Sequence, residues 1–229
     1  MSTRLLPALI AGLAVLVSAC AGDSDNGSTG TGDSAAENAA TTESGPTYTQ
    51  FADFPGQTLV TTEYGAPLGI QVKAIDAEWL PELAGESANA GAHYLAVYLA
   101  VTGELADRGV QGARLDFLEA KFKIEQGACD EYATESPDFC YVKARPVAEP
   151  ERDIADNTWR THTWYAANII SIRTDIEAGE TLIGVVGFEI PDDANLVGNV
   201  ELCGPTKEHW YGSSTFPCVP IPEPEGARS

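Results

Sequence analysis

The sequence predicts an all-β protein, an antiparallel β-sandwich preceded by a signal peptide and a disordered tether. Three observations support this prediction. Apolar residues alternate with other residues along several segments between positions 68 and 203, turn-forming residues separate these segments, and no segment shows strong helical periodicity. Six to eight strands arranged in this way are typical of a β-sandwich.

The composition excludes two classes of protein. The 229 residues include 13 Lys and Arg against 34 Asp and Glu, which gives a net charge of −21. A nucleic-acid-binding protein needs clustered cations to hold phosphates, and a polybasic membrane-surface protein needs them to hold anionic lipids. Hydrophobic residues make up 44% of the chain, which is ordinary for a globular protein and argues against disorder of the whole chain.

Residues 1–19 are typical of a secretory signal peptide. Arg4 gives a positive start, and the apolar run from Leu5 to Ala19 is too short to span a bilayer. The run ends in Val17-Ser18-Ala19-Cys20, which resembles the lipobox of bacterial lipoproteins. The resemblance implies that Cys20 is lipidated and anchors an extracytoplasmic protein to the cell membrane. The alternative is an ordinary secretory signal in which Cys20 is incidental.

Residues 20–50 are predicted to be a disordered acidic linker after the lipidated cysteine. The segment is rich in Gly, Ser, Thr and Ala, and between Ala21 and Gln50 it contains acids but no bases. Its apolar content is too low to offset the entropy of ordering the chain. It would therefore tether a folded domain, residues 51–216, to the membrane.

Alternation of apolar residues predicts the strands of the folded domain. The segment 93–102 is apolar on both faces and should be central, while Lys73 and Glu119 should face water on half-buried strands. Short helices near 77–84 or 149–157 are alternatives to irregular structure there. Residues 217–229 contain four prolines and should form an extended tail, tied down near its start by Cys218. The predicted strands are 68–74, 93–102, 116–125, 168–173, 180–190 and 197–203.

These patterns resemble a known family. The residues that carry the resemblance are Leu68-Gly-Ile-Gln-Val72, the strand from His93 to Val101, Phe117 with Phe122, Gly127 and Tyr132, Ile176-Glu-Ala-Gly-Glu180, and the strand from Gly184 to Pro191. Together they look like the immunoglobulin-like domain of bacterial lipoproteins related to the mycobacterial immunoprotective extracellular proteins. The resemblance implies an immunoglobulin-like sandwich, and this family has no established common activity.

Four cysteines follow Cys20, and an even number in an exported domain predicts two disulfides. Proximity favours Cys129–Cys140 and Cys203–Cys218 among the three connectivities. A zinc site is the alternative, but zinc motifs need closer pairs than separations of 11 and 15 positions.

Motifs for catalysis or cofactor binding are absent from the sequence. The three histidines, His93, His162 and His209, are isolated, and neither G-x-S-x-G nor a phosphate-binding glycine loop occurs. We therefore predict no catalytic residue, cofactor or metal. Two acidic clusters, 153–157 and 192–195, leave cation binding as an alternative, although such clusters are more often solvated turns.

An aromatic segment is the strongest binding candidate. Exposed Trp and Tyr rings stack on sugars or anchor protein interfaces. The alternative is that these rings fill or cap the core of the sandwich. The candidate residues are Trp159, Arg160, His162, Trp164, Tyr165, Trp210 and Tyr211.

The sequence thus predicts a non-catalytic, lipid-anchored, extracytoplasmic binding module of the bacterial cell envelope. Its expected partners are the membrane, through the lipid, and an envelope protein or wall polymer, with no nucleic acid. The alternatives are a cation- or small-ligand-binding accessory lipoprotein and a hydrolase without a recognisable motif.

Overall fold

The protein is described from a computed structural model, over residues 48–125, 134–135, 138–151, 158–168, 173–210 and 212–228. The signal peptide, Cys20 and nearly all of the linker lie outside these residues. The described part is all-β, and its helical turns are two short 3₁₀ segments, η1 (Phe51–Asp53) and η2 (Ser213–Thr215). Among the described residues, no helix has the length and apolarity that crossing a bilayer would require.

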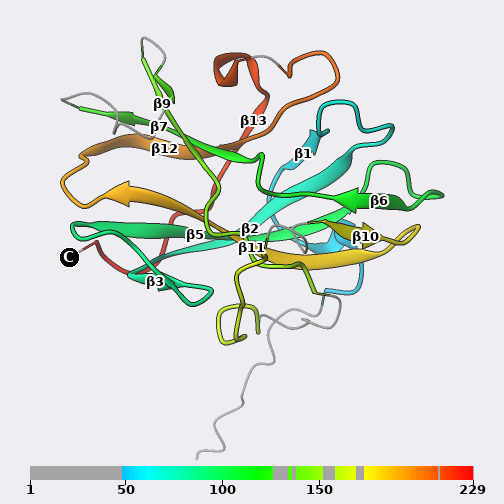
Figure 1. Ribbon diagram of the computed structural model, residues 1–229, viewed down its shortest axis with the longest axis horizontal. Helices are drawn as coiled ribbons and strands as arrows, with labels where there is room; N and C mark the ends of the chain where they lie inside the picture. The colour runs from blue at the N-terminus through cyan, green and yellow to red at the C-terminus, as the bar shows by residue number, and fades with distance from the viewer. Residues whose placement is uncertain are drawn as a thin grey trace, which may run out of the picture. The chain divides into compact units, whose positions relative to one another are not determined.

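Two antiparallel sheets form the sandwich, as the sequence predicts. Figure 1 shows β7, β9 and β12 as one layer above β2, β5 and β11. The four-stranded sheet has the order β1 (Thr58–Thr61), β2 (Ile70–Leu80), β5 (Ala92–Gly103), β11 (Thr181–Pro191). The five-stranded sheet has the order β13 (Cys218–Pro220), β12 (Leu196–Cys203), β7 (Glu119–Ile124), β9 (Cys140–Lys143), β8 (Thr134–Glu135). Two strand pairs complete the fold, β10 (Thr174–Ile176) with β6 (Val110–Ala113) and β3 (Glu82–Leu83) with β4 (Glu86–Ser87).

The central position predicted for segment 93–102 is confirmed, because β5 pairs with both β2 and β11 along most of its length. Its two faces belong to two different cores. Val97 and Leu99 point into the space between the sheets, whereas Tyr94 and Tyr98 point to the outer face of the four-stranded sheet. Alternation places every second side chain on the same face, so a strand that is apolar on both faces must be covered twice.

The outer face of the four-stranded sheet is covered by two non-strand segments, 48–54 and 158–164. Phe54, Trp159 and Trp164 pack there against Tyr98 and Val185. The ring of Tyr48 stacks on Phe54 with centroids 4.6 Å apart. This cover explains why strands β5 and β11 contain apolar residues at consecutive positions.

Lys73 and Glu119 are buried, although the alternation places both on a water-facing side. Lys73 lies beneath η1, where its ammonium donates to the carbonyls of Phe51, Ala52 and Phe54. Sequence alternation assigns residues to a face but does not reveal that an irregular segment covers that face.

The suggestion of a helix near 77–84 is wrong. Ala77 and Trp79 lie in β2 opposite Val97 and Leu95 of β5, and the segment then turns through Ala84, at a φ of 54°, into β4. Pairing with the central strand therefore determines the conformation here. In segment 149–157, the other suggested helix, Glu151 forms a β-bridge with Ile183 of β11. Residues 152–157 of that segment lie outside the described part. The expected strand at 168–173 also falls mostly outside it, and the described strand begins at Thr174.

The chain changes sheets after β9. On either side of a cis Arg145–Pro146 bond, the amides of Arg145 and Ala148 donate to the carbonyls of Gly187 and Val185 on β11. A Cβ atom at Gly187 would lie 2.8 Å from Leu83 and 2.9 Å from the Pro146 ring, so only glycine fits this crossing. The segment covers the outer edge of β11, and covered edges resist unwanted strand pairing.

The segment predicted as a proline-rich tail is held to both sheets. Its first residues form β13, which pairs with β12, and Glu225 forms a parallel bridge with Glu78 of β2. The amide of Trp79 donates to the carbonyl of Glu225, and the Arg228 guanidinium lies 4.8 Å from the Trp79 ring centroid. Cys218 thus fixes only one of two attachment points.

Candidate ligand-binding site

The aromatic segment 158–165 does not form an exposed surface. The amides of Thr161 and His162 donate to the carbonyl of Thr158, so the chain turns instead of extending. Trp159 and Trp164 are 4% and 7% exposed. Their indole N–H groups donate to the Asp76 carboxylate and the Trp159 carbonyl. These two rings therefore belong to the core, which was the alternative to a binding surface.

The polar neighbours of these tryptophans are also engaged. Arg160 pairs with Asp76 and Glu225. The His162 ring meets Trp164 edge-on, and its Nε2 lies 3.1 Å from Glu151, within ion-pair distance but without hydrogen-bond geometry. Tyr165 is 74% exposed, and it is the one strongly exposed ring of the segment.

A different aromatic pair lies at one end of the sandwich. Trp210, a predicted binding residue, packs against Tyr64 with ring centroids 4.0 Å apart and planes inclined by 30°. Tyr64 is 70% exposed. Tyr211, which was predicted as a binding residue together with Trp210, lies outside the described residues. Sequence reasoning missed Tyr64, and the available signal was a lone aromatic residue in the turn between two strands.

Two loops bring this pair together. Tyr64 lies in the β1–β2 loop and Trp210 in the β12–β13 loop, which Figure 1 shows on the same side of the protein. The Thr61 hydroxyl and the Thr62 amide both donate to the carbonyl of Pro205. A Cβ atom at Gly204 would lie 2.5 Å from the Thr61 hydroxyl, so glycine allows the loops to approach this closely.

The predicted Cys203–Cys218 disulfide is confirmed and closes the base of the Trp210 loop. Cys140 is also disulfide-bonded, while Cys129, its predicted partner, lies outside the described residues. A closed loop has fewer conformations available when the ligand is absent. The disulfide therefore restricts the positions that Trp210 can take.

A cavity of about 330 Å³ opens beside the aromatic pair. It combines four aromatic rings with three acids and one lysine. This mixture suits a ligand with both apolar faces and polar groups. The lining residues are Glu63, Tyr64, Asp116, Phe117, Glu119, Lys143, Pro205, Trp210 and Phe216.

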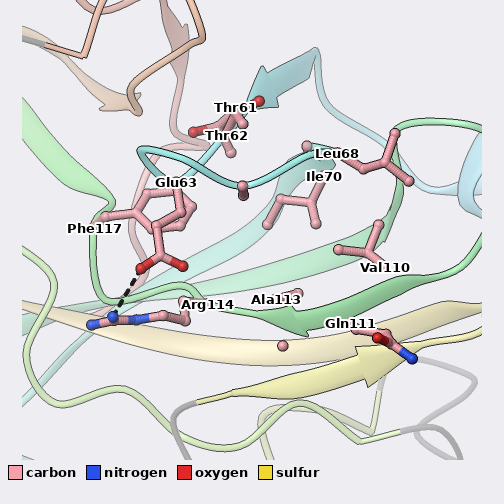
Figure 2. A pocket seen from close by; sticks show the side chains of 13 residues that line it. Thr61, Thr62, Glu63, Leu68, Ile70, Val110, Gln111, Ala113, Arg114 and Phe117 are labelled. Atoms are coloured by element: carbon pink, nitrogen blue, oxygen red, sulfur yellow. Dashed lines mark hydrogen bonds and ion pairs between the residues drawn. The ribbon is translucent and has the colours of Figure 1, made fainter.

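Arg114 pairs with two acids in this region. Its guanidinium donates to both carboxylate oxygens of Asp116 and, at 3.0 Å, to Glu63. Figure 2 shows the Glu63 carboxylate pointing toward this guanidinium, beside the ring of Phe117. Hydrogen bonds to Asp116 raise the pKa of Arg114 further above its ordinary value, so its charge is permanent. The cavity drawn in Figure 2 measures only about 20 Å³, room for about one water molecule.

A second large cavity, of about 360 Å³, shares Asp116 and Lys143 with the first. Its other charged residues are Glu86 and Arg145. Lys143 and Arg145 are exposed, and among the described residues neither has an acid within ion-pair distance. The lining residues are Glu86, Asp116, Lys143, Ala144, Arg145, Pro146, Val147, Ala166 and Ala167.

Within the described ranges, no group of three or more His, Cys, Asp or Glu residues is arranged to hold a metal ion. In the acidic cluster 192–195, Asp192 lies 2.5 Å from Nδ1 of His93. Residues 153–157, the other cluster, lie outside the described part.

Comparison of this chain with models of protein families, with curated proteins and with solved structures finds no match.

Proposed function

We propose that the protein is a lipid-anchored, extracytoplasmic module of the bacterial cell envelope that binds a ligand at the loop end of its β-sandwich, without catalysis. The signal sequence and Cys20 support the anchoring, and the resemblance to the immunoprotective extracellular proteins supports an envelope role. The ligand would belong to the envelope, as a wall polymer or another envelope protein.

One observation carries the binding part of this proposal. The Tyr64–Trp210 pair lines a cavity of about 330 Å³ and leaves Tyr64 70% exposed. Burying an aromatic ring stabilises a folded protein, so a large ring left in water is informative when it borders a cavity. Trp and Tyr are also the residues that contribute most to binding energy at interfaces.

The anchoring is tested by expressing the full chain in a bacterium supplied with labelled palmitate. We expect label on the wild-type protein and none on Cys20→Ser. Equal labelling of both proteins, or of neither, would contradict lipidation at Cys20.

The binding is tested with the lipidated protein, held in detergent on a resin, over which solubilised envelope proteins and fragmented wall polymers are passed. We expect one component to be retained saturably by the wild type and lost with Tyr64→Ala or Trp210→Ala. Tyr165→Ala is the matched control, because Tyr165 is equally exposed but borders neither large cavity. If Tyr64→Ala and Trp210→Ala retain the component as well as the wild type does, the binding site lies elsewhere. Cleavage of a retained polymer would contradict the non-catalytic role.

A further inference from the structure

We propose that the two large cavities form one groove, and that this groove binds an oligosaccharide carrying carboxylate or phosphate groups. This inference rests on the proposed function and names its ligand class. The cavities share Asp116 and Lys143 in their walls, so one ligand can contact both. Cavities of about 330 and 360 Å³ lie within the size range of small-molecule sites.

The first cavity matches the two-sided chemistry of a sugar ring. A pyranose has an apolar face of C–H groups and a rim of hydroxyls. The Tyr64 and Trp210 rings offer apolar surface, and aromatic side chains with a polar tip suit half-wet contacts of this kind. Asp116 and Glu63, which line the same cavity, are acceptors for hydroxyl hydrogens.

The second cavity supplies cations. In a chain with a net charge of −21, most cations of the described part are engaged by acids or carbonyls. Four cations are exposed without such a partner among the described residues, and of these only Lys143 and Arg145 border the second cavity; the other two are Arg108 and Lys123. Lys143 lies at the junction with the aromatic cavity. A carboxylate or phosphate on the ligand would give both cations the partner that the described residues do not provide. The engaged cations are Lys73, Arg114, Lys121, Arg160, Arg173, Lys207 and Arg228.

The acids beside Lys143 do not oppose this assignment. Arg114 binds both oxygens of Asp116 and also contacts Glu63, so much of their negative charge is balanced locally. Glu86 lines the charged cavity away from the aromatic pair, where its carboxylate can accept a sugar hydroxyl. Glu119, the third acid of the first cavity, is buried and lies opposite Lys143 in the β7–β9 register. Counted with Arg114, the groove holds four acids and three cations, so it is far less negative than the chain as a whole.

The charges also select among other ligands. An acyl chain carries no charge and would leave Lys143 and Arg145 without partners in the charged cavity. A long nucleic acid carries many phosphates, which the acidic protein would repel. A short anionic glycan carries only a few charges, and these would lie beside the two cations. An acidic peptide is the remaining possibility, and the experiment separates it.

The test is a titration of the full lipidated protein in detergent, followed by tryptophan fluorescence and calorimetry at constant salt. The probes are tetragalacturonate and its methyl ester, which have the same rings and differ in charge. Glucose 6-phosphate and glucose form a second matched pair, which tests phosphate as the anion. Inorganic phosphate and tetraglutamate test an anion without a sugar.

We expect the acid tetramer to bind about tenfold more tightly than its ester, the size of effect that a charged hydrogen bond gives. The double variant Lys143→Gln/Arg145→Gln should remove this difference while leaving the affinity for the ester unchanged, and Lys143→Gln alone should reduce it. Trp210→Ala and Tyr64→Ala should weaken both tetramers by about tenfold or more. Lys123→Gln, an exposed lysine of β7 that lines neither large cavity, should match the wild type. Unchanged melting temperatures show that each variant is folded.

Several results would overturn the inference. Equal affinity for acid and ester in the wild type, or a preference that survives Lys143→Gln/Arg145→Gln, would remove the anionic component. Tetraglutamate binding as tightly as tetragalacturonate would identify an acidic peptide instead. If no sugar binds while the resin still retains an envelope component through Tyr64 and Trp210, the ligand class is wrong and the proposed function stands. If the resin retains nothing either, the proposed function fails as well.

Discussion

Asp76 and Arg160 form a bidentate ion pair across 84 positions of sequence, with Nε–Oδ2 and Nη2–Oδ1 distances of 2.5 Å. The indole of Trp159 donates to the same carboxylate at 2.9 Å. Arg160 also contacts Glu225 in the C-terminal segment. One carboxylate on β2 therefore holds the 158–162 turn on the outer face of the four-stranded sheet and, through Arg160, holds the chain end beside β2.

Loss of this carboxylate should destabilise the fold in a pH-dependent way. Burial by itself raises the pKa of Asp76, but hydrogen bonds from Arg160 and Trp159 outweigh it and hold the pKa below the ordinary value of 3.8. Because the folded pKa is lowered, the stabilisation is present above pH 3.8 and is lost as the pH falls through the folded pKa. We expect Asp76→Asn to lower the free energy of unfolding by about 1–3 kcal/mol at pH 7.

Urea denaturation from pH 7 to pH 2 measures this effect. The difference between wild type and Asp76→Asn should stay constant to about pH 5 and shrink below pH 3.8. Asp107→Asn, in an exposed loop, is the control and should match the wild type. A difference that stays constant down to pH 2 would show that ionisation of Asp76 contributes nothing.

Tryptophan substitutions should separate stability from binding. Trp159 is 4% exposed within the outer core, so Trp159→Ala should cost about 3–5 kcal/mol of unfolding free energy. Trp210 is partly exposed at the cavity, and Trp210→Ala should cost less than about 1 kcal/mol. Chemical denaturation monitored by circular dichroism checks both values. Equal costs for the two variants would contradict their assignment to core and site.

Removal of the Cys203–Cys218 disulfide should destabilise the protein by about 3 kcal/mol, the loop-entropy value for a separation of 15 residues. The double variant Cys203→Ser/Cys218→Ser is compared with the wild type by urea denaturation under oxidising conditions. The same variant should bind more weakly at the site because Trp210 loses its restraint. If stability falls and binding is unchanged, the disulfide does not position Trp210.

Lys73 should hold the N-terminal cover on the sheet. Its ammonium lies 2.7, 3.1 and 3.3 Å from the carbonyl oxygens of Phe54, Phe51 and Ala52, and Lys73→Met would leave these acceptors without their donor. We expect a loss of about 1–3 kcal/mol and faster hydrogen exchange in residues 50–56. Lys123→Met, on an exposed position of β7, is the control. Unchanged exchange in Lys73→Met would show that ring packing alone holds the segment.

The sequence alone determined the strands and part of their covalent cross-linking. Alternation is a local property with a period of two residues, so it revealed β5, β7, β11 and β12 and showed that β5 must be covered on both faces. Proximity along the chain was also enough to select Cys203–Cys218. These features depend on neighbours in sequence, which is why a sequence can display them.

The tertiary structure decided what covers each face and which aromatic rings remain exposed. Trp159 and Trp164 are indistinguishable from binding residues in the sequence, but the outer face of β5 required large side chains and buried both. Tyr64 meets Trp210 only because Pro205 is hydrogen-bonded to the end of β1 and Gly204 permits the approach. Contacts between distant segments depend on how the sheets pack, and no local periodicity encodes them.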